Sequence, residues 1–270
     1  MRGRRLVVLT AASVLLCGCA SSGLPTVTAD HTQAIDAALH LWSGFPAGSS
    51  ARPLVLAGPE TINPTSAGNF TVAGALPGGS SIWHQQRLIT AAQALAELRG
   101  SSTPDGSSTS ATLSITAARL GTAIFATDRG QRALPAWQFS FAGVRDVASV
   151  LAIAPGNRWP RTQTPLEDHV GLAARIAPDG NTVTILFLGG SPDPGPCQTN
   201  YQADTFQSDT AVLVAIRELP GTASQPAADA GDPPLACNAS GYPRSVTVTL
   251  DSVLAGRVLI DSYGAPLPGR

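Results

Sequence analysis

Lysine is absent from this chain of 270 residues, because all 17 basic side chains belong to arginine. Enzymes that form a Schiff base on lysine, hold a nucleotide with a P-loop lysine, or use an S-x-x-K nucleophile pair all need a lysine amine. The absence therefore excludes these three kinds of chemistry, whatever fold the chain adopts.

Charge of either sign is also scarce, since charged residues make up 13% of the chain where about 25% is usual. The formal net charge is -1, and no basic run follows the first five residues. A nucleic-acid partner is therefore not expected. Hydrophobic residues make up 43% of the chain, which is enough for a folded core.

The motifs that usually mark an active site or a metal site are missing. The chain has no HExxH, G-x-S-x-G, G-x-G-x-x-G, CxxC or EF-hand pattern. His31 and His40 are nine residues apart on a predicted helix, which places them on opposite sides. The cluster Glu167-Asp168-His169 consists of neighbours whose side chains diverge, so a solvated loop is favoured over an acid–base pair. The sequence predicts no catalytic residue, no metal site and no cofactor.

The N-terminus has the layout of a bacterial export signal. Arg2, Arg4 and Arg5 precede an apolar run from Leu6 to Leu16, which is shorter than the roughly 20 residues of a membrane-spanning helix. The following Leu-Cys-Gly-Cys resembles a lipobox, in which a small residue precedes the cysteine that becomes lipidated. Because Gly18 precedes it, Cys19 is the predicted lipidation site, with residues 1–18 as the signal peptide.

Two further cysteines remain after such processing. Cys17 would leave with the signal and Cys19 would carry lipid, so Cys197 and Cys237 would be the thiols of the mature chain. An even pair outside the cytoplasm is typical of a disulfide. We therefore expect a Cys197–Cys237 disulfide.

The first half of the chain reads as two helices followed by strands. Asp30 begins a helix with an apolar stripe that includes Ile35 and Trp42, and Thr90 with Gln93 forms a capping box for a second helix that ends near Gly100. Residues 57–81 are rich in loop-forming residues. Strands are predicted at 53–56, 111–120, 123–127, 133–142 and 147–154, with a hairpin turn at 128–131.

The second half is predicted to be β throughout, with strands at 170–177, 182–188, 201–207, 210–218, 245–250 and 256–261. The predicted fold class is α+β, mainly β: an N-terminal α+β half followed by a small all-β sandwich or open barrel. The predicted organisation is a signal peptide (1–18), a tether (19–29), an α+β domain (30–154), a proline-rich linker (155–165) and an all-β domain with one disulfide (166–270).

Two aromatic positions raise the question of ligand binding. Trp137 alternates with Phe139 and Phe141 on one strand face, which favours a core position. Trp159 lies between Arg158 and Arg161 in the proline-rich linker. Packing at a domain interface is the leading interpretation of Trp159, and Arg158, Trp159 and Arg161 are the candidate contacts for an anionic or glycan ligand.

Taken together, the lipobox, the strand Leu134-Pro-Ala-Trp137 and the stretch from Cys197 through Cys237 to Leu250 resemble the uncharacterised secreted lipoproteins of actinobacteria. The resemblance implies export, a lipid anchor and a β-rich body on the extracytoplasmic face of the cell membrane. It supplies no catalytic residues.

The leading functional hypothesis is a lipid-anchored cell-envelope protein that acts by binding or scaffolding, with the membrane, an envelope protein or a glycan as partner. Enzymatic activity is left open, with binding favoured over catalysis. Two alternatives are an envelope hydrolase whose dispersed acid and base residues meet only in the fold, and a small-ligand carrier that uses an interdomain cleft.

Overall fold

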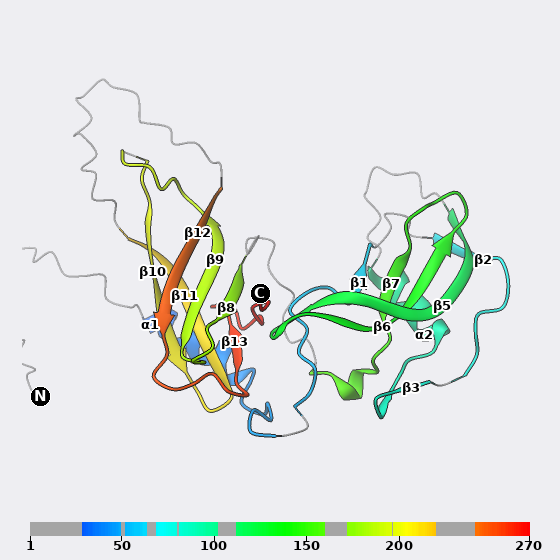
Figure 1. The fold of residues 1–270 in the computed structure, drawn as a ribbon, viewed down its shortest axis with the longest axis horizontal. Helices are drawn as coiled ribbons and strands as arrows, with labels where there is room; N and C mark the ends of the chain where they lie inside the picture. Colours follow the sequence, from blue (N-terminus) through cyan, green and yellow to red (C-terminus); the bar gives the residue numbers. More distant parts are fainter. Residues whose placement is uncertain are drawn as a thin grey trace, which may run out of the picture.

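The computed structural model of the protein describes residues 29–49, 52–63, 69–79, 81–101, 112–159, 172–195, 197–219 and 241–270. This described part belongs to the α+β class and is mainly β. Its helices are α1 (Ala29–His40), α2 (Ala91–Ser101) and a short 3-10 helix at Pro155–Asn157. Figure 1 shows two lobes, one with α2 and β1–β7 and the other with α1 and β8–β13.

The first lobe is built on one five-stranded sheet with the order β1-β7-β6-β5-β2. Its strands are β1 (Thr61–Ile62), β2 (Asn69–Val72), β5 (Thr112–Thr127), β6 (Gly130–Phe141) and β7 (Ala148–Leu151). A separate small hairpin joins β3 (Ile82–Trp83) to β4 (Gln86–Arg87). The predicted loop at 57–81 therefore contains β1 and β2, whose pairing partners lie far along the chain and leave no local signal.

The longest strand corrects a second prediction. Residues 112–127 form the single 16-residue strand β5, where two strands were predicted at 111–120 and 123–127. Gly121 does not break it, because it makes room for the neighbouring strand: a Cβ there would lie 2.9 Å from Oε1 of Gln138. Nε2 of Gln138 in turn donates to the carbonyl of Thr122 at 2.9 Å. The predicted hairpin turn after Thr127 is confirmed.

Helix α2 begins as its sequence predicts. The backbone N–H of Thr90 donates to Oε1 of Gln93 at 2.9 Å, and the N–H of Gln93 donates to the Thr90 hydroxyl at 3.3 Å. This reciprocal pair is the capping box. The apolar side of α2 joins the core of the first lobe, which also contains Trp137 and Phe139. Trp137 is buried and donates from Nε1 to the carbonyl of Ile89 at 2.8 Å, so the predicted core position is confirmed.

The second lobe contains two three-stranded sheets, with the orders β10-β11-β13 and β12-β9-β8. All six predicted strands of this half are present, as β8 (Ala173–Ile176), β9 (Thr182–Gly189), β10 (Asn200–Gln207), β11 (Ala211–Leu219), β12 (Tyr242–Thr249) and β13 (Val258–Ile260). Val212 and Val214 of β11 share one core with Val183 and Ile185 of β9, so the two sheets pack against each other. Among the described strands, no ladder joins these sheets to the first lobe.

Helix α1 covers the opposite face of β11. Its buried Ile35 and Ala38, with Trp42 just beyond its end, pack with Leu213 of β11 and Val258 of β13. This helix was predicted to belong to an α+β domain at residues 30–154, whereas its packing places it on the second lobe. Periodicity shows that a helix has an apolar face but does not show which distant strand will cover it. The division into two domains at residues 155–165 stays a prediction.

The tip of the β5–β6 hairpin reaches the second lobe, close to the C-terminus (Figure 1). The N–H of Gly269 donates to the carbonyl of Thr127 at 3.0 Å. The hairpin also binds the chain segment that follows α1, because the N–H of Asp128 donates to the carbonyl of Val55 at 3.3 Å. Three segments that are far apart in the sequence therefore meet at this tip.

Candidate functional site

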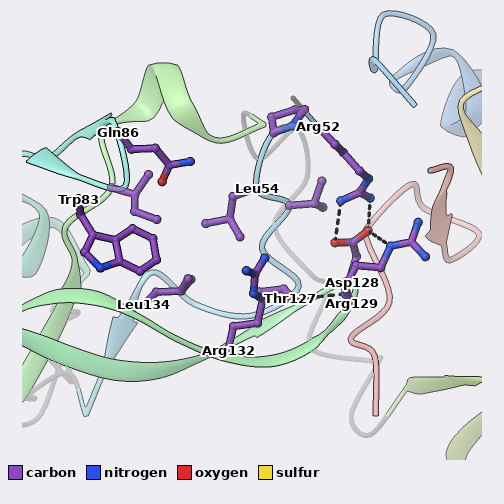
Figure 2. Close-up of a pocket in the computed structure, with 12 residues that line it drawn as sticks. Arg52, Leu54, Trp83, Gln86, Thr127, Asp128, Arg129, Arg132 and Leu134 are labelled. Atoms are coloured by element: carbon purple, nitrogen blue, oxygen red, sulfur yellow. Dashed lines mark hydrogen bonds and ion pairs between the residues drawn. The ribbon is translucent and has the colours of Figure 1, made fainter. Parts of the chain in front are cut away.

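A pocket of about 270 Å³ opens beside the hairpin tip. Its walls come from residues 52–55, from Trp83 and Gln86 of the β3–β4 hairpin, and from the β5–β6 hairpin between Thr127 and Leu134. Figure 2 shows these groups around a common space, with Trp83 and Gln86 at one end and Arg52, Asp128 and Arg129 at the other. The pocket therefore has an aromatic end and an ionic end.

At the ionic end, Asp128 is almost completely buried and forms an ion pair with Arg52. Arg52 also donates from Nε to the carbonyl of Gly256 at 2.9 Å. Nε of Arg129 lies 3.5 Å from Oδ2 of Asp128, and its Nη2 donates to the carbonyls of Ala255 and Arg257 at 2.6 and 2.8 Å. Arg129 thus connects the β5–β6 hairpin to the second lobe, and Arg52 connects the segment that follows α1 to the same part of the second lobe.

Burial disfavours the charged form of Arg129. Desolvation lowers the pKa of its guanidinium, while the neighbouring Asp128 carboxylate raises it and Arg52 lowers it again. Arginine nevertheless stays protonated in proteins. The ionic end is therefore a network of fixed charges that the structure itself uses.

At the aromatic end, Arg132 projects from β6 toward the pocket, between Trp83 and the ionic end in the view of Figure 2. The Arg132 side chain is exposed, and within the described residues no ion pair or hydrogen bond engages its guanidinium. Leu54 and Leu134 supply apolar wall on either side. The pocket thus combines a free cation with an aromatic and aliphatic surface.

The chemistry available in this pocket is that of binding an anion. Three arginines and one aspartate give the lining a formal charge of +2. Its hydroxyl group, on Thr127, donates to the carbonyl of Gly130 at 2.6 Å, so it is engaged in the hairpin turn. In the described ranges, no group of three His, Cys, Asp or Glu side chains is arranged to hold a metal ion.

The candidate ligand contacts predicted from the sequence lie elsewhere. Trp159 stacks on Trp42 with ring centroids 6.0 Å apart and meets Phe45 edge-on at 5.1 Å, so it packs with the core cluster that α1 joins. Arg158 is buried and its Nη1 lies 2.6 Å from Glu60 Oε2. Neither residue lines the pocket, and Arg161 lies outside the described residues. Their role as ligand contacts stays a prediction.

The positions predicted for processing and crosslinking are only partly described. Cys19 and Cys237 lie outside the described residues, as does the cluster at 167–169. Cys197 lies in the connection between β9 and β10. The lipidation of Cys19 and the Cys197–Cys237 disulfide both stay predictions.

The residues of the pocket were not predicted as a group. Trp83 and Arg132 are separated by 49 positions, and the β3–β4 hairpin that presents Trp83 is only two residues long on each side. The available signal was the turn sequence Asp-Arg-Gly-Gln, which carries two of the few charged residues and is followed at once by another arginine.

Comparisons with protein-family models, with curated proteins and with solved structures found no match to this chain. None of the helices in the described part of the chain is both long enough and apolar enough to cross a membrane.

Proposed function

We propose that this protein is a lipid-anchored protein of the cell envelope that binds a small molecule in the pocket beside the β5–β6 hairpin. The observation that carries the binding role is the Arg132 guanidinium, which is unpaired within the described residues and faces a partly apolar pocket. Small-molecule sites are concave and have convergent polar groups, and half of the twelve residues that line this pocket are polar or charged. A small-molecule site fits both the binding role and the small-ligand carrier that were predicted from the sequence.

The anchor rests on the lipobox and on the length of the tether. Nine residues (20–28) lie between Cys19 and Ala29, where α1 begins, and the ten Cα-to-Cα steps from Cys19 to Ala29 reach at most about 35 Å. A lipid on Cys19 would therefore hold the second lobe close to the membrane surface. In this proposal, β8–β13 form a small open sandwich with α1 on one face. The first lobe carries the pocket.

The anchor is tested by expressing the full chain in a bacterium that processes lipoproteins and separating membrane from soluble fractions. The wild type and a Cys17→Ala variant are expected in the membrane fraction, with an acylated residue 19 as the first residue by mass spectrometry. Cys19→Ala is expected to leave the membrane fraction or to accumulate as the unprocessed precursor. An unmodified N-terminus at another residue would overturn the anchor.

The binding role is tested on the same material. Native mass spectrometry of the wild-type protein released in mild detergent is expected to show a population that carries a non-covalent small molecule. Arg132→Gln is expected to lose that population, while Arg119→Gln keeps it, because Arg119 is exposed on β5 and does not line the pocket. A bound molecule that persists in Arg132→Gln would show that the pocket is not its site.

A further inference from the structure

We infer that the pocket takes a small aromatic carboxylate, with its acid group on Arg132 and its ring against Trp83. This inference rests on the proposed binding function and names the class of ligand. It is argued from the charge, the supply of hydrogen-bond donors, the wall chemistry and the size of the pocket.

The charge of the pocket calls for an anion. Arg132 contributes a full positive charge that no described acidic side chain neutralises. Asp128, the one acid in the lining, is engaged by Arg52 and Arg129. A guanidinium without an acidic partner can form charge-assisted hydrogen bonds with a bound anion.

The supply of donors favours a carboxylate over a phosphate. Arg52 donates hydrogen bonds to Gly256 and Asp128. Arg129 donates hydrogen bonds to Ala255 and Arg257 and forms an ion pair with Asp128. One free guanidinium remains, and its planar fork matches the two oxygens of a carboxylate. A phosphate dianion would need further donors to satisfy its oxygens.

The walls favour a flat, apolar body for the ligand. Trp83 is half-buried and supplies the aromatic ring of the lining, and the buried side chains of Leu54, Leu134 and Ile153 lie behind the pocket surface. Two aromatic rings attract each other in offset or edge-on arrangements beyond the area that they bury. A single six-membered ring with a carboxylate carries its acid at the edge of the ring, so one small ligand can contact both Trp83 and Arg132.

The size of the pocket limits the ligand to a small one. A volume of about 270 Å³ is below the range of roughly 300–1,000 Å³ typical of sites for drug-sized ligands. Benzoate is the simplest molecule that has the required charge, shape and size, and it is therefore the probe for the test. With nine non-hydrogen atoms it should bind with a dissociation constant of about 0.1 mM, if each atom contributes between the extremes seen for small ligands.

The test is isothermal titration calorimetry, in which benzoate is titrated into the wild-type protein released from membranes in mild detergent. Saturable one-to-one binding is expected. Benzamide keeps the ring and loses the charge, and acetate keeps the charge and loses the ring, so each should bind at least about tenfold more weakly. A charge-assisted hydrogen-bonded pair contributes roughly 1.5–3 kcal/mol, so Arg132→Gln should weaken benzoate binding about 10- to 100-fold.

Two further variants separate the site from general effects. Trp83→Leu should weaken benzoate but leave the weak binding of acetate unchanged, because acetate has no ring to stack. Arg119→Gln should bind benzoate like the wild type, since this exposed arginine lies outside the pocket. Thermal unfolding of each variant confirms that the protein titrated is folded.

Three outcomes would overturn the inference. No benzoate binding at 10 times the expected dissociation constant excludes the ligand class, and benzoate binding that survives Arg132→Gln places the site elsewhere. Inorganic phosphate that binds more tightly than benzoate, and is lost in Arg132→Gln, identifies a phosphate site instead. If benzoate fails while a co-purifying molecule is still lost in Arg132→Gln, the proposed binding function stands and only the ligand class is wrong.

Discussion

The two ends of the pocket use the same side chain in opposite ways. At the ionic end, Arg52 and Arg129 share the buried carboxylate of Asp128 and donate to carbonyls of the second lobe. At the aromatic end, Arg132 is exposed and has no described partner, although it lies only three positions after Arg129. Among the three arginines that line this pocket, two are engaged in structural contacts and one has no partner within the described residues.

This difference leads to opposite expectations for mutation. A buried carboxylate between two guanidinium groups contributes to stability mainly through what its removal leaves behind, which is uncompensated charge. An exposed guanidinium contributes little to stability. Substitutions at the ionic end should therefore change unfolding, and substitutions at Arg132 should change ligand binding alone.

The largest effect is expected from Asp128→Ala. It removes the acid that neutralises Arg52 and Arg129 at the point where the hairpin meets the second lobe. Removing one partner of a buried pair costs about 3 kcal/mol or more, and the free energy of unfolding in urea measures it. Asp146→Ala is the matched control, because Asp146 is exposed. Equal effects of the two substitutions would mean that the ionic end has no special structural role.

A smaller effect is expected from Gly269→Ala, which changes the same contact from the side of the second lobe. A Cβ at Gly269 would lie 2.9 Å from the carbonyl carbon of Arg129 and still closer to the N–H of Gly130. Because both neighbours are backbone atoms, the hairpin tip must shift, at a cost of about 2 kcal/mol. Gly74→Ala, where a Cβ would meet nothing within 4 Å, should not destabilise the protein. A fully stable Gly269→Ala would show that the tip is loosely held.

The parts of this fold that were predictable are those with local causes. The backbone N–H groups of Thr90 and Gln93 each donate to the other residue's side-chain oxygen, so four consecutive residues determine where α2 begins. The six segments predicted as strands of the second lobe each overlap a strand of the structure, of three to nine residues. Among the exceptions, the strand predicted at 53–56 forms only isolated bridges at Leu54 and Leu56, and β1 and β2 depend on partners such as Val150 and Leu113 that lie more than 40 positions away.

The candidate site could not be predicted for the same reason. Arg52, Trp83 and Arg132 come from three separate segments, and no spacing in the sequence relates them. Trp159 shows the converse case, because a conspicuous aromatic between two arginines packs on Trp42 and Phe45. Its partners follow α1, whose packing on β11 the helical period does not encode.

The smallest effect, at Glu97, shows that an arginine partner does not always make a carboxylate favourable. Arg158 is buried between Glu60 and Glu97, with its Nη2 3.6 Å from Oε1 of Glu97. Burial raises the pKa of Glu97, Arg158 lowers it by less, and Glu60 raises it further. The folded protein therefore binds the Glu97 proton more tightly than the unfolded chain does, so this contribution to stability is present at low pH. It is lost as the pH rises from the unfolded pKa through the raised folded pKa.

Glu97→Gln removes this titration while it keeps the shape of the side chain. Relative to the variant, the wild type should lose stability as the pH rises from about 4 toward neutral, the reverse of the trend expected for a carboxylate that its ion pair stabilises. Melting temperatures of both proteins across that pH range measure the difference. Glu60→Gln is the comparison, because Glu60 makes the closer contact with Arg158, at 2.6 Å, and its loss should destabilise the protein at neutral pH. If the wild type instead gains stability relative to Glu97→Gln as the pH rises to neutral, the Arg158 charge outweighs the burial, and Glu97 belongs with Asp128 among the carboxylates that hold the fold together.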